Sequence, residues 1–106
     1  MIAYRISDYF TIVNNHAFQK DKIRTILDHD FVFWIGDLNF RLETGSFETN
    51  EIIDHVQQNK LSPLLQRDEL ILTVKNYAAF RGFSEGNITF PPTYKFFIGT
   101  HDYDRK

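Results

Sequence analysis

The sequence contains no cysteine, which excludes disulfide frameworks, thiolate zinc sites and cysteine nucleophiles. It has no run of about 18 apolar residues, the length that a membrane span requires. Met1–Phe10 carries Arg5 and Asp8 where a signal peptide would be apolar. Twelve Lys and Arg against 14 Asp and Glu give a net charge of −2, which argues against nucleic acid as a partner. We therefore expect a soluble, cytoplasmic chain.

Apolar and aromatic residues are plentiful. Of the 106 residues, 42% are hydrophobic and 16% are aromatic, eleven of them Phe, so there is ample apolar area for a core. No internal repeat, low-complexity tract or Gly/Ser linker divides the chain. The sequence therefore predicts one domain or part of one.

Apolar residues at three- and four-residue steps predict a first helix that ends at Asn14-Asn15. Arg5 and Asp8 share one face of this helix. The apolar positions are Tyr4, Ile6, Tyr9, Phe10 and Val13.

Two further helices are predicted later in the chain. Asn50 is the expected N-cap of one, and Ser62-Pro63 is expected to break it. Asp68 is the expected N-cap of the other, which should end before Gly82. The apolar positions are Ile52, Ile53 and Val56 in the first of these, and Leu70, Ile71, Val74, Tyr77 and Ala78 in the second.

Two apolar runs are typical of strands. Residues 31–35 are all apolar and lie between His29-Asp30 and Gly36, which predicts a buried strand. Residues 93–98 follow Pro91-Pro92, which forces an extended backbone, and are the second candidate.

Asp37 and Asn39 follow the first predicted strand and are two residues apart. In extended chain their side chains would point to the same face. An Asp there can orient or deprotonate a water, and an Asn amide can donate to developing negative charge. The pair suits hydrolysis of an anionic ester, although Gly, Asp and Asn are also ordinary turn formers, so a simple turn is the alternative.

Two longer motifs carry a family resemblance. The segment Trp34–Arg41 (Trp-Ile-Gly-Asp-Leu-Asn-Phe-Arg) resembles the signature of inositol polyphosphate 5-phosphatases. The segment Phe83–Phe96 is similar to the second landmark of that family, whose core is Phe-Pro-Pro-Thr-Tyr-Lys followed by an aromatic residue. Residues 26–30 and Tyr103-Asp104 extend the resemblance over nearly the whole chain.

The resemblance implies an α+β fold, a partial four-layer α/β/β/α sandwich of the DNase I-like kind with helices and few strands in this chain. Residues 1–106 would form a single partial domain, the central portion of the catalytic domain. The implied activity is magnesium-dependent hydrolysis of the 5-phosphate from a phosphoinositide lipid or a soluble inositol phosphate. The main protein ligand of magnesium is expected outside this chain, so we expect the isolated chain to be inactive. Peripheral membrane contact is a further expectation.

The resemblance also implies roles for individual residues. Asp37 would position or activate the attacking water, and Asn39 would stabilise the phosphoryl transition state. Tyr94 and Lys95 match the pair that grips the neighbouring 4-phosphate, although an exposed edge-strand pair is the alternative. Arg41 either faces substrate or pairs with an acidic neighbour and holds the loop.

The remaining aromatic and imidazole side chains are interpreted as structural. Trp34 and Phe40 are expected to pack in the core. The histidines show no metal-ligand spacing and are expected at the surface or in loops: His16, His29, His55 and His101. Two rival functions remain open, a non-catalytic module that binds phosphoinositide or protein, and a nuclease of the same superfamily.

Overall fold

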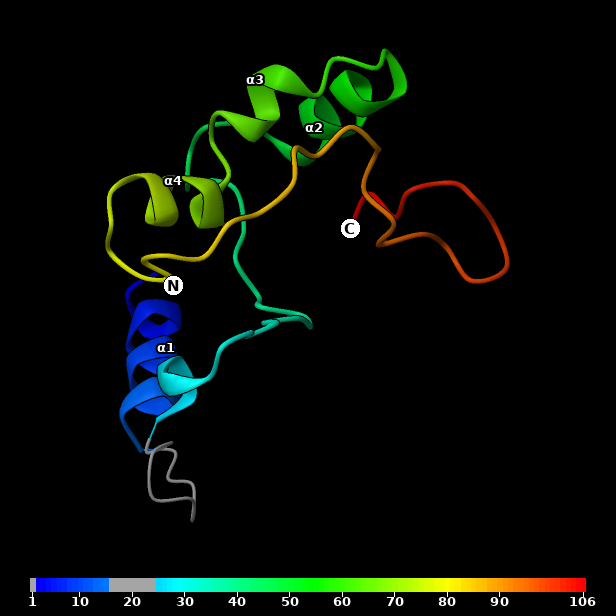
Figure 1. Cartoon of the computed structure of the whole chain (residues 1–106). Helices are drawn as coiled ribbons and strands as arrows, with labels where there is room; N and C mark the ends of the chain where they lie inside the picture. Colours follow the sequence, from blue (N-terminus) through cyan, green and yellow to red (C-terminus); the bar gives the residue numbers. More distant parts are fainter. Residues whose placement is uncertain (1, 16–24) are drawn as a thin grey trace.

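A computed structural model describes residues 2–15 and 25–106. In this part of the chain the helices are α1 (Ile2–Asn15), the 3₁₀ helix η1 (Ile26–Asp28), α2 (Thr49–Gln57), α3 (Ser62–Leu65) and α4 (Glu69–Lys75). Figure 1 shows the α-helices along one curved side of the molecule, with extended segments beside them. The radius of gyration is 16.9 Å, whereas a compact domain of this length has about 13 Å. The chain is therefore open in shape. None of the helices described is long and apolar enough to cross a membrane.

The helix predicted at the start of the chain is confirmed as α1. Tyr9 and Val13 are buried, whereas Tyr4 and Phe10 are 64% and 45% exposed, so the buried face is narrower than predicted. Arg5 lies on the same face as Asp8, as expected, and the two form an ion pair at 3.3 Å.

Asn50 does not cap the second helix, so that prediction is wrong. The helix α2 begins two residues earlier than predicted, at Thr49, with Glu48 at the N-cap position. The side-chain oxygen of Asn50 instead accepts a hydrogen bond from Arg105 at 2.6 Å, a partner too distant in sequence to be read from local propensity. Pro63, which was expected to break a helix, lies in the first turn of α3, where its missing N–H is not needed.

The predicted cap of the third helix is confirmed. The carboxylate of Asp68 accepts a hydrogen bond from the backbone N–H of Ile71 at 3.0 Å. The helix α4 ends at Lys75, however, and does not reach Ala78. Tyr77 has a φ of +55° and is 73% exposed, because this left-handed residue turns the chain out of the helix. The prediction of Tyr77 on the apolar face is therefore wrong.

The prediction of a buried strand at residues 31–35 is also wrong for the structure described. Phe31, Phe33 and Ile35 are 85–87% exposed, while Val32 and Trp34 between them are half-buried. This alternation is that of an extended segment with one covered face. No described segment pairs with it, so the other face has nothing to bury it.

The second strand candidate, residues 93–98, forms a single antiparallel bridge. Phe96 pairs with Tyr103, and the only other bridge in residues 2–15 and 25–106 joins Leu42 to Asp68. The described chain therefore consists of helices, extended segments and two bridges, without the sheets of the predicted sandwich.

The core lies where α1 meets the chain that follows α4. Its buried members are Tyr9, Val13, Ala79 and Phe80. The Trp34 ring lies 5.2 Å from the rings of both Tyr9 and Phe80. Phe40 also packs against this cluster, so the predicted packing roles of both aromatics are confirmed. These two rings fix both ends of the segment that carries Asp37 and Asn39.

Candidate functional site

Asp37 and Asn39 lie in an exposed turn between Trp34 and Phe40. The backbone N–H of Asn39 donates to Oδ1 of Asp37 at 2.9 Å. Asn39 has a φ of +58°, so the chain here is not extended and the predicted two-residue alternation does not apply. The turn that the sequence left as an alternative is present. It nevertheless keeps both polar side chains at the surface, next to each other in one loop.

Arg41 contacts the side chain of Asn39. Its Nη2 atom donates to Oδ1 of Asn39 at 3.3 Å. This contact orients the amide, because Oδ1 is occupied and the two Nδ2 hydrogens are left to donate elsewhere. In the described chain no carboxylate forms an ion pair with the Arg41 guanidinium. The acidic partner that the sequence suggested for this guanidinium is therefore absent from that part of the chain.

The loop is anchored to the start of α4 by backbone pairing on both sides of the Leu42–Asp68 bridge. Glu69 donates its backbone N–H to the Arg41 carbonyl at 2.8 Å, and Glu43 donates its own to the Arg67 carbonyl at 2.8 Å. The Glu69 carboxylate also accepts the backbone N–H of Arg41 at 3.0 Å. An ion pair between Arg67 and Glu43, at 3.1 Å, closes the far end of the pairing. The position of the loop therefore depends on α4.

The second group of predicted site residues lies on a hairpin near the C-terminal end of the chain. Nζ of Lys95 is 3.0 Å from Oδ2 of Asp104, and the Asp104 N–H donates to the Lys95 carbonyl at 2.9 Å. The rings of Phe96 and Tyr103 stack at 4.7 Å, and the Tyr103 hydroxyl donates to the Pro92 carbonyl at 2.7 Å. These contacts hold the lysine while leaving its side chain 55% exposed.

The ion pair shifts the pKa of both partners. The carboxylate of Asp104 accepts the backbone N–H of Lys106 and a hydrogen bond from Lys95, and these bonds lower its pKa below the usual 3.8. The hydrogen bond to Asp104 and the charge of that carboxylate raise the pKa of Lys95 above 10.5. Lys95 is therefore a firmly charged ammonium group, and Tyr94 beside it is 79% exposed.

The two groups of predicted site residues are not in contact. Within the ranges described, no hydrogen bond or ion pair joins the loop of residues 37–41 to Tyr94 or Lys95. Figure 1 shows the segment after η1, coloured cyan to teal, apart from the orange-to-red hairpin. The structure thus brings Asp37, Asn39 and Arg41 together in one place and Tyr94 with Lys95 in another.

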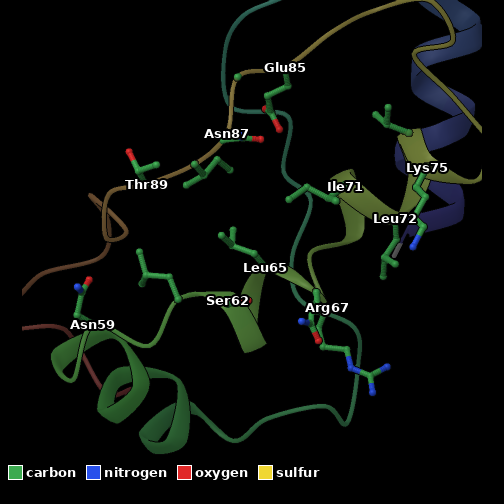
Figure 2. Close-up of a pocket in the computed structure, with 15 residues that line it drawn as sticks. Asn59, Ser62, Leu65, Arg67, Ile71, Leu72, Lys75, Glu85, Asn87 and Thr89 are labelled. Carbon is green, nitrogen blue, oxygen red and sulfur yellow. The ribbon is translucent and has the colours of Figure 1, made fainter.

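An open groove of about 1140 Å³ lies between the α3–α4 region and the extended residues 85–89. Figure 2 shows Leu65 and Ile71 on its helical side, facing the segment that carries Glu85 and Asn87. None of the five predicted site residues lines this groove. It is therefore separate from the candidate site.

Comparison with known proteins now gives the family. The model of Endonuclease/Exonuclease/phosphatase family 2 matches residues 2–106. This chain belongs to that family. The match includes both the loop of Asp37 and Asn39 and the hairpin of Lys95.

Several relatives of this family member are named as 5-phosphatases of phosphoinositides or inositol phosphates. It is 39% identical over 100 residues to phosphatidylinositol 4,5-bisphosphate 5-phosphatase A of Rattus norvegicus. The match covers 94% of this chain and 10% of the relative. It is 43% identical over 100 residues to inositol-1,4,5-trisphosphate 5-phosphatase 1 of Schizosaccharomyces pombe, with coverage of 94% and 9%. The chain thus spans about a tenth of the length of these relatives. The enzyme family predicted from Trp34–Arg41 and Phe83–Phe96 is confirmed.

A solved structure supports the same assignment. The inositol polyphosphate 5-phosphatase domain of SPsynaptojanin, in complex with inositol (1,4)-bisphosphate and calcium ion, is 41% identical and superposes with a TM-score of 0.86. The match covers 96% of this chain and 29% of that one. This similarity supports the predicted DNase I-like fold at the level of the family.

The described residues of this family member do not by themselves form a magnesium site. Magnesium takes near-octahedral oxygen coordination, whereas the 37–41 loop offers one carboxylate, that of Asp37, one oxygen of which already accepts the Asn39 N–H. No group of three or more His, Cys, Asp or Glu in the described ranges could hold a metal ion. Nδ1 of His55 lies 2.7 Å from the Glu51 carbonyl, and His101 is exposed in the hairpin. His16 lies outside the described residues.

Two residues of the site were missed by sequence reasoning. Glu69 holds Arg41 from 28 positions away, and its place in the first turn of a helix looks like an ordinary helix-start glutamate. Asp104 was noticed as part of a motif, but its pairing with Lys95 was not predicted. Opposite charges flanking a bridge would have been the available signal for Asp104. No local signal identifies Glu69.

Proposed function

We propose that this chain supplies the catalytic loop and a phosphate-gripping hairpin of a magnesium-dependent 5-phosphatase that acts on phosphoinositides or soluble inositol polyphosphates. The observation that carries this proposal is the contact between Arg41 and Asn39. Since Arg41 occupies the amide oxygen, both Nδ2 hydrogens of Asn39 can donate to phosphoryl oxygens as charge develops on them. The names of the relatives support the same reaction class.

In this proposal Asp37 acts on water. One oxygen of its carboxylate is held by the Asn39 N–H, so the other can orient a water and take up its proton. A bond forms between that water oxygen and phosphorus, while the bond between phosphorus and the inositol oxygen breaks. The inositol oxygen leaves as a hydroxyl with a proton from solvent, and inorganic phosphate is released.

The hairpin would bind the neighbouring 4-phosphate. Lys95 is charged and 55% exposed, and Tyr94 beside it offers a hydroxyl donor. Asp104 keeps the ammonium group in place before the phosphate arrives. A phosphate that accepts a hydrogen bond from Lys95 would share the ammonium group with Asp104.

We expect the isolated chain to lack turnover. The loop and the hairpin do not touch in the described ranges, and a single loop carboxylate cannot complete a magnesium shell. We therefore propose that the metal is held mainly by residues outside this chain. The proposal also includes a four-layer α/β/β/α sandwich around the site and a cytoplasmic protein with peripheral membrane contact.

A chimera tests the proposal. The segment of the SPsynaptojanin phosphatase domain that matches this chain is replaced by residues 2–106, and phosphate release is measured with magnesium. The substrates are phosphatidylinositol 4,5-bisphosphate in vesicles and soluble inositol 1,4,5-trisphosphate. The chimera should turn over at least one of them, and Asp37→Asn and Asn39→Ala should each lower kcat by roughly 10²- to 10³-fold.

The controls separate this proposal from a non-catalytic binding role. Asp30→Asn removes another exposed carboxylate upstream of the loop and should leave kcat unchanged. A folded chimera that binds inositol 1,4,5-trisphosphate without releasing phosphate would favour the binding role. Equal activity on phosphatidylinositol 4,5-bisphosphate in vesicles and on soluble inositol 1,4,5-trisphosphate would argue against a preference for membrane substrates.

A further inference from the structure

Glu69 makes two hydrogen bonds to the backbone of one residue, Arg41. Its carboxylate accepts the Arg41 N–H at 3.0 Å, and its own N–H donates to the Arg41 carbonyl at 2.8 Å. Glu69 is half-buried at the first turn of α4, so its side chain is held between the helix and the loop. Both polar groups of the Arg41 backbone are therefore fixed by a single residue 28 positions away.

The fixed backbone of Arg41 sets the point from which its side chain extends, and so limits where its guanidinium can lie. From that position Nη2 reaches Oδ1 of Asn39 at 3.3 Å. Glu69 therefore acts on the Asn39 amide through one intermediate residue, and it contacts neither Asn39 nor Asp37 in the described structure.

We infer that Glu69 is a positioning residue that holds the Asn39 amide in the orientation needed to donate to phosphoryl oxygens. This inference rests on the function proposed above for Asn39. The Glu69 carboxylate accepts the backbone N–H of Arg41 and does not form an ion pair with the Arg41 guanidinium. The guanidinium is consequently left free to hold Asn39, and a neutral acceptor at position 69 should serve as well as a carboxylate.

The backbone of Asn39 explains why such an anchor is needed. Its φ of +58° lies in the left-handed region, which asparagine tolerates better than other residues with a side chain but still less well than glycine. Without the anchor at Arg41 the turn can relax to ordinary dihedral angles, and the amide then points elsewhere. Strain of this kind persists only where surrounding contacts hold it.

Amide hydrogen exchange of the full 106-residue chain tests the first step. Glu69→Ala should raise the exchange rate of the Arg41 amide on the order of tenfold, because a hydrogen bond to a charged acceptor is lost. Glu69→Gln keeps an acceptor and should change that rate less than threefold. Glu51→Ala is the matched control, a first-turn glutamate of α2 that does not touch the loop. Protection of the Leu72 amide, which donates to Asp68, reports that α4 is intact.

The second step is tested at the Asn39 side chain by NMR. Glu69→Ala should shift the two Nδ2 proton resonances of Asn39 toward those of a free amide, as should Arg41→Lys, whereas Glu69→Gln should not. In Arg41→Lys the backbone amide of residue 41 should stay protected, because its bond to Glu69 is kept. This variant also tests the relay if Glu69→Ala does not fold.

Titration with inorganic phosphate completes the test. Phosphate should shift the Asn39 Nδ2 resonances in the parent chain, and Glu69→Ala should reduce that response at least threefold while the response of Lys95 persists. Unchanged exchange at Arg41 and unchanged Asn39 resonances in Glu69→Ala would overturn the inference. If those signals change as expected but phosphate moves neither Asn39 nor Lys95 in the parent chain, the positioning role stands and the proposed function fails.

Discussion

Lys95 and Asp104 face each other across a hairpin, with Nζ and Oδ2 3.0 Å apart. The two residues are also joined through their backbones, since the Asp104 N–H donates to the Lys95 carbonyl. Only 10% of the Asp104 side chain is exposed, compared with 55% of the Lys95 side chain. The Asp104 side chain is therefore largely covered and fixed in place, and it holds the more exposed ammonium group of Lys95.

Asp104→Asn should loosen Lys95 and weaken phosphate binding at the hairpin. The amide keeps the shape of the side chain but removes the charge that pairs with the ammonium group. We expect a threefold or greater loss of affinity for inositol 1,4,5-trisphosphate in the chimera, measured by calorimetry. Asp102→Asn, on the same hairpin and exposed, is the matched control and should bind normally. Tighter binding by Asp104→Asn would mean that Asp104 mainly competes with the phosphate.

The order of the hairpin should depend on pH at both extremes. The folded-state pKa of Asp104 is lowered, so its contribution is present above the usual 3.8 and is lost as pH falls below that value. The folded-state pKa of Lys95 is raised, so its contribution is present below 10.5 and is lost as pH rises above it. The backbone amide resonance of Asp104, whose N–H donates to the Lys95 carbonyl, should be constant between these limits and move beyond them. In Asp104→Asn the change at low pH should disappear, and a change that persists would assign it to another carboxylate.

The left-handed turn at Asn39 predicts different effects of two substitutions. Asn39→Ala should lower the free energy of unfolding by about 1 kcal/mol, because alanine tolerates a positive φ less well than asparagine. Asn39→Gly should cost little stability, yet it removes the amide as completely as alanine does. Urea denaturation measures the first effect and chimera turnover the second. Asn59, with a φ of +55°, gives a matched pair of substitutions outside the site.

Phe80 should be the most sensitive aromatic of the core. It is 6% exposed, and its ring lies 4.4 Å from that of Tyr9 and 5.2 Å from that of Trp34. Phe80→Ala should lower the free energy of unfolding by about 3–5 kcal/mol, because a cavity replaces these contacts. Phe31→Ala, at a position 85% exposed, should change it by less than about 0.5 kcal/mol in the same urea experiment. Equal losses would show that the exposed face is covered in solution.

Local signals in the sequence were sufficient for features that depend on neighbouring residues. The steps of Tyr9 and Val13 predicted α1, and Asp68 predicted the start of α4, because helix periodicity and capping act over a few residues. The end of α4 was not predictable in this way. The turn after it depends on a positive φ at Tyr77, and a tyrosine, unlike a glycine, gives no sequence signal for that conformation.

The candidate site also combines contacts between neighbouring residues, which could be predicted, with contacts between distant residues, which could not. Asp37, Asn39 and Arg41 are close in sequence, so their grouping was predictable, although the turn that joins them replaced the expected extended chain. Glu69 was not predictable, because its hydrogen bonds cross 28 positions. Whether Tyr94 and Lys95 act with the loop on one substrate stays a prediction.

The pairing of residues 41–43 with residues 67–69 has a consequence for the chain between them. The intervening residues, which include α2 and α3, form a long loop. The backbone pairing around the Leu42–Asp68 bridge holds the two ends of this loop together. Closing a longer loop costs little additional entropy. Insertions near the exposed Asn59-Lys60 turn can therefore lengthen this loop without moving Asp37 and Asn39. An insertion at this turn should therefore leave the hydrogen bond between Asp37 and the Asn39 N–H unchanged.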